Sequence, residues 1–220
     1  MPDLPIPRNA QLVLVAGKMN PSMHHPQWYR AISAIDDKEL RGTLKGESGA
    51  TTPIVSQFQF GSPNFTITCQ PHLWTIQSAE ESSWKRMIEI ASLVFAKTNN
   101  PSMLAYGLMV QRHIDTDRDV KAFLADSVAG LHLGLPTSKS VNTNITLSNP
   151  GDGFTITSAI QTSVLGDRVV FGLYHYDYPT NEIESVLDGR FDRFISDSDK
   201  FFADIVAAVN RGGAKGADHE

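Results

Sequence analysis

The chain has 220 residues, of which 41% are hydrophobic and 20% are charged, and its formal net charge is −5 at pH 7. This composition is that of an ordinary globular protein, with enough residues to bury a sizeable core. An acidic net charge argues against general affinity for nucleic acids or anionic membrane surfaces, so we expect neither as a partner.

A single cysteine, Cys69, excludes an internal disulfide and fits a reducing compartment. It alternates with Phe65 and Ile67, which predicts a buried and unreactive thiol. The apolar run Leu12 to Ala16 is too short to span a membrane, and the residues before it lack the order of a signal peptide. The sequence therefore predicts a cytoplasmic protein.

The N-terminal third begins with residues 1–10, which carry three prolines and are expected to form an extended arm. Gln11 to Gly17 is an apolar run of strand length. Pro26 is placed as at a helix start, and Trp28 and Ile32 follow at helical spacing. His24 and His25 precede this helix, and paired histidines could bind metal or respond to pH, but we expect a loop with two exposed imidazoles. Leu40 to Thr52 is expected to form a loop or an edge hairpin.

The central stretch, residues 64–97, predicts two strands followed directly by an amphipathic helix. Phe65, Ile67 and Cys69 alternate with polar residues, and Trp74 and Ile76 resume the alternation after Pro71-His72. Ser78 and Glu81 have the spacing of a capping box. The predicted helix covers residues 79–97, and one face of it carries Trp84, Met87, Ile88, Ala91, Val94 and Phe95.

After this helix, Met103 to Ile114 predicts a long strand, and Asp115 or Asp117 is expected to cap a short helix. Val141 to Leu147 is again typical of a strand. The next predicted elements are a hairpin, with strands Phe154–Val164 and Arg168–Tyr178, and a last amphipathic helix over residues 198–210, followed by a flexible tail at 211–220.

These elements predict an α+β fold with a mostly antiparallel sheet, flanked by two main amphipathic helices. Residues 11–210 are expected to form one domain. The segment Phe65–Cys69 reads FTITC, and Phe154–Ser158 reads FTITS, so the sequence carries an internal echo. It arises either from strand composition alone or from duplication, which predicts two strand-strand-helix halves, 11–114 and 115–210.

Two histidine-aspartate pairs are the main candidates for chemistry. His113 and Asp115, like His175 and Asp177, are two residues apart near strand ends, so each pair lies on one face of its strand. If the strands were neighbours, the four side chains could converge on a metal ion. The alternative is that both pairs are solvated strand ends, and the sequence predicts no other cofactor.

Three tyrosines, Tyr174, Tyr176 and Tyr178, occupy one face of the last predicted strand. Such a face could contact another protein, whereas the alternative is an ordinary core face. The chain contains no G-x-x-x-x-G-K-[ST] phosphate loop, no G-x-G-x-x-G turn and no G-x-S-x-G elbow. The commonest nucleotide-binding and hydrolase motifs are therefore missing.

The order of elements resembles that of a known family. An N-terminal strand, the Asn64-Phe65 strand pair with Trp74, the Trp84 helix, the strand from Tyr106 to Ile114 and the closing helix are similar to those of a sporadically distributed bacterial protein family with no assigned function. The resemblance covers nearly the whole chain, although Leu131 to Ser148 departs from it. It implies no site residues.

Three functional hypotheses follow from these observations. The first is a non-enzymatic protein-binding or assembly component, with a protein partner or a second copy of the chain. The second is a metal-dependent enzyme that uses His113, Asp115, His175 and Asp177. The third, suggested by the family resemblance, is a bacterial or phage defence or immunity protein.

Overall fold

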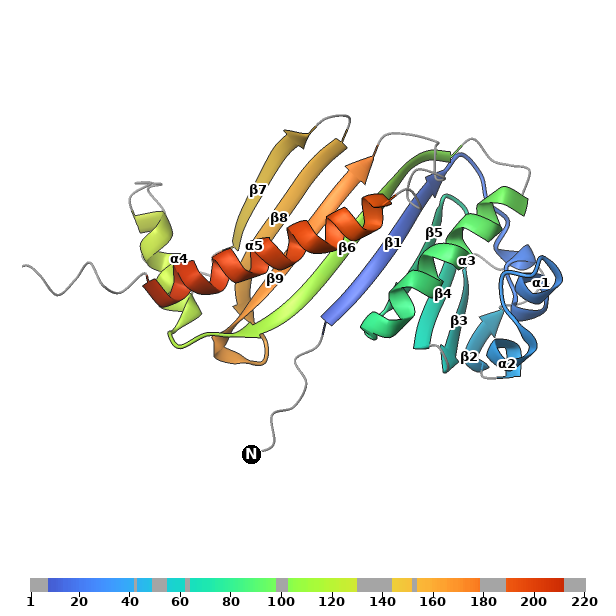
Figure 1. Cartoon of the computed structure of the whole chain (residues 1–220), viewed down its shortest axis with the longest axis horizontal. Helices are drawn as coiled ribbons and strands as arrows, with labels where there is room; N and C mark the ends of the chain where they lie inside the picture. The colour runs from blue at the N-terminus through green and yellow to red at the C-terminus, as the bar shows by residue number, and fades with distance from the viewer. Residues whose placement is uncertain are drawn as a thin grey trace, which may run out of the picture.

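The computed structural model shows a broad sheet with helices laid across it (Figure 1). The residues that it describes are 8–41, 43–48, 55–61, 64–97, 103–129, 144–151, 154–178 and 189–211. Predictions about 1–7, 130–143 and 212–220 lie outside these residues.

Nine described strands form one sheet in the order β2-β3-β4-β5-β1-β6-β9-β8-β7, and every neighbouring pair is antiparallel. The strands are β1 (Arg8–Ala16), β2 (Thr43–Ser48), β3 (Ser56–Gly61), β4 (Asn64–Gln70), β5 (Leu73–Ser78), β6 (Met103–Asp115), β7 (Asn144–Gly151), β8 (Phe154–Ser163) and β9 (Gly166–Tyr178). The predicted α+β class with an antiparallel sheet is confirmed.

The helices are η1 (Pro21–Met23), α1 (Pro26–Ala31), α2 (Asp37–Arg41), η2 (Glu81–Ser83), α3 (Trp84–Lys97), α4 (Val120–Ala129) and α5 (Phe191–Arg211). The predicted last helix thus begins at Phe191 and not at residue 198. The Ser78–Glu81 capping box does not form, because the Ser78 hydroxyl accepts the amide of Glu80. Helix α4 is capped by Asp119, whose carboxylate accepts the amide of Ala122 at 2.8 Å, and not by Asp115 or Asp117.

The two halves of the sheet repeat one order of elements. In the first, β1 is followed by α1 and α2, by the meander β2 to β5 that returns to pair with β1, and by α3. In the second, β6 is followed by α4, by β7 to β9 that return to pair with β6, and by α5. Because β1 and β6 pair antiparallel, an approximate two-fold axis passes through the Leu12–Leu108 pair.

The internal echo falls at matching places in these halves. Ile67 of β4 pairs with Ile76, which pairs with Leu12. Ile156 of β8 pairs with Tyr176, which pairs with Leu108. The two segments therefore match residue by residue about the axis, which favours duplication over chance composition. In this topology the halves meet between α3 and β6, whereas the sequence predicted a boundary at 114/115, at the end of β6.

One face of the sheet is buried beneath α3 and α5, which lie across it in Figure 1. Strand alternation sends the large apolar side chains to this face, where they pack on the apolar stripes of the two helices. From the strands the fully buried residues include Leu12, Leu14, Phe65, Ile67, Trp74, Ile76, Tyr106 and Leu108, and from the helices Met87, Ala91, Val94, Phe194 and Phe202. This layer is the core of the protein.

The opposite face, which we call the open face, keeps most of its described side chains partly exposed, although Thr75 is buried. Its central residues are Gln11, Val13, Thr66, Thr68, Gln77, Met109, Thr155, Thr157, His175 and Asp177. Antiparallel sheets commonly pack one face on a core and leave the other solvated.

Candidate functional site

The two histidine-aspartate pairs lie on neighbouring strands of the open face but do not meet. His175 pairs with Met109, whereas His113 pairs with Phe171. The two imidazoles are thus offset by four residues, or about 13 Å along the strands. Among the described residues, no group of three or more His, Cys, Asp or Glu side chains could hold a metal ion. The metal-dependent enzyme stays a prediction that this arrangement does not favour.

Each histidine has its own local partner. His113 Nδ1 lies 2.7 Å from the Ser163 hydroxyl, and its ring lies beside Phe171. His175 Nε2 lies 3.2 Å from Asp177 Oδ1. Burial lowers the pKa of His175, and the nearby carboxylate opposes this shift.

Gly107 of β6 makes room for the His175 imidazole. A Cβ atom at position 107 would lie 2.5 Å from His175 Nε2 and 3.3 Å from Asp177 Oδ1. The imidazole therefore lies over a strand position that has no side chain. This arrangement explains how a histidine in the middle of the open face is largely shielded from water.

The three tyrosines of β9 correct the prediction of a protein-contact face. Tyr174, Tyr176 and Tyr178 are only 8%, 2% and 6% exposed, and they point toward α5. Tyr174 and Tyr176 pack against Phe194, and the Tyr176 hydroxyl donates to Asp197 Oδ2 at 2.6 Å. Burial is the main cause of the raised pKa of Tyr176. This face is the core face that the alternative interpretation described.

The His24-His25 segment is also buried in part, contrary to the expectation of two exposed imidazoles. His24 is 6% exposed, and its Nδ1 lies 2.9 Å from the Tyr29 hydroxyl, which accepts the Trp74 indole N–H at 3.0 Å. Burial lowers the pKa of His24 to about 4, with a smaller contribution from His25. Since His25 Nδ1 accepts the amide of Trp28, both histidines have structural partners at the start of α1.

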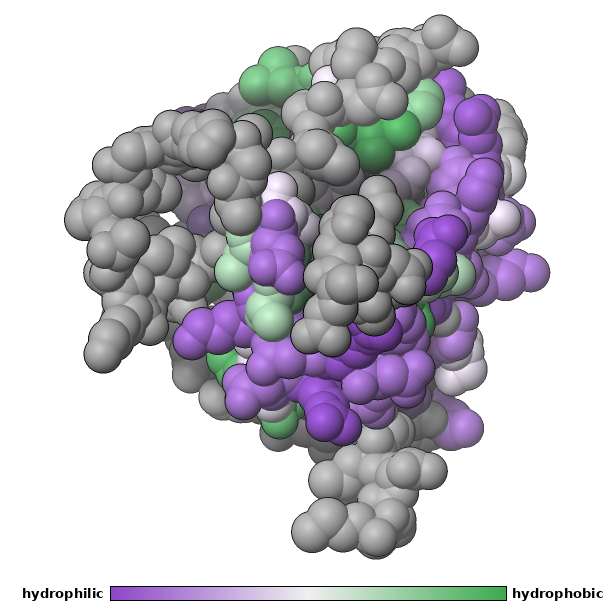
Figure 2. Space-filling view, turned by 90° about the vertical axis from the view of Figure 1, so that its left-hand side faces the viewer, coloured by the Kyte–Doolittle hydropathy of each residue, from purple (hydrophilic) through white to green (hydrophobic). Residues whose placement is uncertain are grey.

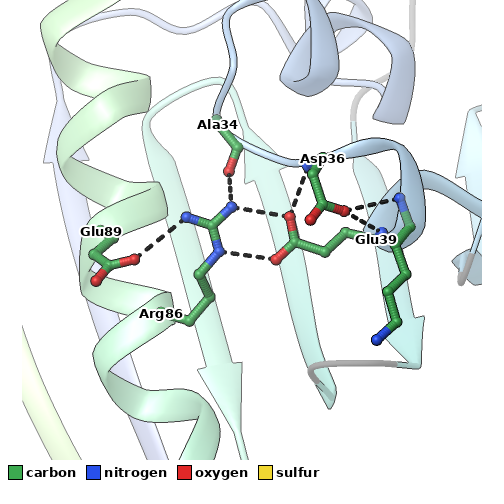
Figure 3. Close-up of polar contacts among 6 residues, drawn as sticks. Ala34, Asp36, Glu39, Arg86 and Glu89 are labelled. Atoms are coloured by element: carbon green, nitrogen blue, oxygen red, sulfur yellow. Dashed lines mark hydrogen bonds and ion pairs between the residues drawn. The ribbon is translucent and has the colours of Figure 1, made fainter.

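An arginine-glutamate pair fixes α2 against α3 (Figure 3). Arg86 Nε donates to Glu39 Oε1 at 2.8 Å, and a second guanidinium nitrogen reaches Glu39 Oε2 at 2.9 Å. The same nitrogen donates to the Ala34 carbonyl at 2.8 Å, and the Asp36 amide donates to Glu39 at 2.8 Å. Because each guanidinium nitrogen of Arg86 and both carboxylate oxygens of Glu39 have protein partners, we interpret this pair as a structural clamp.

The open face differs from the rest of the surface in its charge. Its described side chains on β1, β3 to β6, β8 and β9 include no lysine, arginine or glutamate, and its carboxylates are Asp115, Asp177 and, at the hairpin end, Asp167. One continuous row across the strands reads Gln59, Thr66, Gln77, Gln11, Met109, His175 and Thr157. Viewed from the end where α5 finishes, the coloured surface is mainly hydrophilic with small, separate apolar patches (Figure 2).

A groove of about 500 Å³ lies between α3 and the start of α5. Its apolar lining comes from two matching pairs of residues, Trp84 with Phe191 and Ile88 with Ile195. The rings of Trp84 and Phe191 meet edge to face across the two halves, with centroids 6.4 Å apart. Its charged residues are Glu81, Lys85, Glu89 and Asp192, so acidic groups predominate around it.

The tip of the β8–β9 hairpin exposes two apolar side chains. Val164 is 94% exposed and Leu165 is 56% exposed, the former being the most exposed large hydrophobic residue in the described part of the chain. A hydrogen bond stabilises the turn, since the Leu165 amide donates to the Ser163 hydroxyl at 2.9 Å.

Comparison of the chain with known proteins found no match. No protein-family model matches the chain, and no curated protein matches it. The resemblance to a sporadically distributed bacterial family, and the defence role that it suggested, therefore stay predictions. Among the described residues, no helix is long and apolar enough to cross a membrane.

Proposed function

We propose that the protein is a non-enzymatic assembly component and that two copies associate through their open faces. The observation that carries this proposal is the charge of the open face, which combines partly exposed apolar and amide side chains and has no lysine, arginine or glutamate on β1, β3 to β6, β8 or β9. The centres of protein interfaces are likewise depleted in charged residues.

The energetics of association support this surface over the helical side. Each copy carries a net charge of −5, so two copies repel at long range. Contact through the open face buries few charges, and charged groups are the most expensive to desolvate. Half-exposed Val13, Met109 and Leu173 gain from burial, while the glutamine and threonine side chains can form hydrogen bonds across the contact.

Sedimentation velocity over a wide range of concentration tests the proposal. We expect the wild-type chain to shift from monomer to dimer, and Gln11→Lys, which adds a charge to the middle of the open face, to weaken the dimer. The control is Ala203→Lys, which adds the same charge to an exposed position of α5.

The two substitutions distinguish a contact through the open face from a contact elsewhere. Ala203→Lys leaves the dimer intact if the open face is the contact. A wild-type chain that stays monomeric at every concentration would overturn the proposal, and so would equal weakening by both substitutions. Circular dichroism of each variant confirms that the fold is retained.

A further inference from the structure

We propose that the contact between two open faces is controlled by pH, and that protonation of His175 tightens it. This inference rests on the proposed function, because it names how association through that same face is regulated. Three features support it: the charges that the open face can carry, the position of His175 on this face, and the carboxylate beside its imidazole.

Histidines are the only groups that can give the central strands of the open face a positive charge. On β1, β3 to β6, β8 and β9 this face has no lysine or arginine, whereas it has carboxylates at Asp115, Asp167 and Asp177. The described side chains that can become cationic there are His113 and His175. While both imidazoles are neutral, two open faces therefore bring only negative charges together.

The remaining charged residues of the sheet on this side lie far from His175. β7, which pairs with β8, has no charged residue. β2 carries Lys45 and Glu47, which pair with Gln59 and Gln57. It lies six strands from β9, or about 29 Å, and its two charges are of opposite sign. Neither edge of the sheet therefore compensates the carboxylates near its centre.

His175 lies among uncharged residues apart from one carboxylate. On its own strand, Leu173 lies on one side of it and Asp177 on the other. The strands on either side surround it with Gly107, Met109, Thr155 and Thr157. Asp177 is thus the one charged group among the described residues that flank the imidazole on this face.

Asp177 is placed to stabilise the protonated imidazole. His175 Nε2 is buried and makes no hydrogen bond within the described part of the chain, yet Asp177 Oδ1 lies 3.2 Å away. Gly107 lets both groups lie over one position of β6, since a Cβ atom there would lie 2.5 Å from Nε2 and 3.3 Å from Oδ1. A proton on Nε2 would therefore change the pair from one negative charge to none.

Association changes the electrostatic balance of this pair. In the single chain, burial lowers the pKa of His175, and Asp177 opposes this shift only in part, because its side chain is 55% exposed and water screens its charge. A second open face removes that water, which strengthens the attraction between the two charges and makes a lone carboxylate costly to bury. The pKa of His175 is then higher in the dimer than in the single chain.

The direction of the pH effect follows from this difference. A group whose pKa is higher in the dimer takes up a proton on association. Its contribution to the dimer is fully present below the pKa of the single chain and is lost as the pH rises through the pKa of the dimer. Acid therefore tightens the open-face contact, and neutral pH loosens it.

Sedimentation velocity of the full chain at pH 7.5 and pH 5.5, at one salt concentration, tests the inference. We expect the dissociation constant of the wild-type dimer to fall about tenfold or more at pH 5.5, since two imidazoles take up protons in each dimer. His175→Gln is expected to lose most of this change.

The matched control is His72→Gln, because His72 is exposed in the turn between β4 and β5 and its replacement removes a titrating group outside the open face. Lower pH reduces the negative charge of every copy, and this control measures that general effect. It should retain the pH dependence of the wild-type chain. Circular dichroism at both pH values confirms that each variant is folded.

Asp177→Asn separates the proposed pair from an effect of net charge. Without the carboxylate, a protonated His175 is a lone cation in the contact, so we expect acid to weaken the dimer of this variant. Net charge alone predicts the opposite, since fewer negative charges reduce repulsion. Tightening of this variant at pH 5.5 by as much as the wild-type chain overturns the inference.

The two proposals fail in different ways. If the wild-type chain dimerises equally at both pH values, or if His175→Gln keeps the full change, the control by pH falls and the open-face contact stands. If the wild-type chain stays monomeric at both pH values and every concentration, the open-face contact itself falls.

Discussion

Replacing Gly172 with alanine measures how closely α5 is docked on the sheet. Gly172 lies on the helix-covered face of β9, and a Cβ atom there would lie 2.5 Å from Cε1 and 2.9 Å from Cδ1 of Phe202. Phe202 is 1% exposed, and the Arg112 guanidinium lies 5.1 Å from its ring centroid. Since Arg112 also bonds to Asp199 at 2.5 Å, the ring has little freedom to move aside without moving α5.

The expected change in the free energy of unfolding is the difference between two opposing effects. Forcing an extra methyl group into a packed core costs about 1–3 kcal/mol. Replacing glycine by alanine recovers about 0.4–1 kcal/mol by restricting the unfolded chain. We therefore expect Gly172→Ala to lower the free energy of unfolding by about 1–2 kcal/mol.

Gly107→Ala is the matched control, because its Cβ would approach His175 Nε2 equally closely, at 2.5 Å. The His175 side chain is 24% exposed on the open face, whereas Phe202 is 1% exposed beneath α5, so the imidazole can move aside at a smaller cost. We expect a change near zero for this variant. Urea unfolding followed by circular dichroism gives both values from the midpoints at constant slope. Equal effects of the two substitutions would refute the argument that α5 restrains Phe202.

Three further predictions concern buried groups. Arg86→Met leaves the Glu39 carboxylate, 5% exposed, without its cation and should cost about 3 kcal/mol of stability in urea unfolding, whereas adding Glu39→Gln should recover part of the loss. The pKa of His24 is about 4 in the folded protein against 6.5 in the unfolded chain, so the unfolded state binds the proton first and stability falls as pH drops from 6.5 to 4. The loss should reach about 3 kcal/mol and be absent from His24→Gln, which pH-dependent urea titrations measure. Cys69 is buried and its pKa is raised to about 12, so a thiol reagent at pH 8 should label it only after unfolding, and rapid labelling of the native protein would contradict this.

Local patterns in the sequence predicted the main elements where one face of an element meets the core. Phe65, Ile67 and Cys69 alternate in the sequence and are all buried in β4. The helical spacing of Trp84 and Met87 likewise matches the buried face of α3. In both cases periodicity is sufficient, because burial on one side leaves the same pattern regardless of the partner.

The errors occurred where a distant residue decides the environment. The segment Asp197-Ser198-Asp199 is typical of a helix start. Asp197 nevertheless lies within α5, where it accepts a hydrogen bond from Tyr176 of the sheet. The His24 imidazole lies 2.9 Å from the Tyr29 hydroxyl, and that hydroxyl also accepts a hydrogen bond from Trp74 of β5, 45 residues further along the chain. Such contacts join residues far apart in sequence, and local periodicity carries no information about them.

The candidate surfaces were visible in the sequence only in part. The alternation of β9 was recognised, but both of its faces carry residues that can be buried or exposed: tyrosines on one, and His175 and Asp177 on the other. The apolar residues of α5, among them Phe194 and Phe202, decide which face is covered. The groove was not predicted, because it forms where two helices 107 residues apart meet, Trp84 being the first residue of α3 and Phe191 the first of α5.

The approximate two-fold axis extends to the groove between α3 and the start of α5. Trp84 and Ile88 on one side match Phe191 and Ile195 on the other. The charged residues around them do not follow this symmetry, because Glu81, Lys85 and Glu89 lie on the η2–α3 side and Asp192 lies on the α5 side. The apolar core positions thus match between the two halves, whereas the charged groups of the same helices differ.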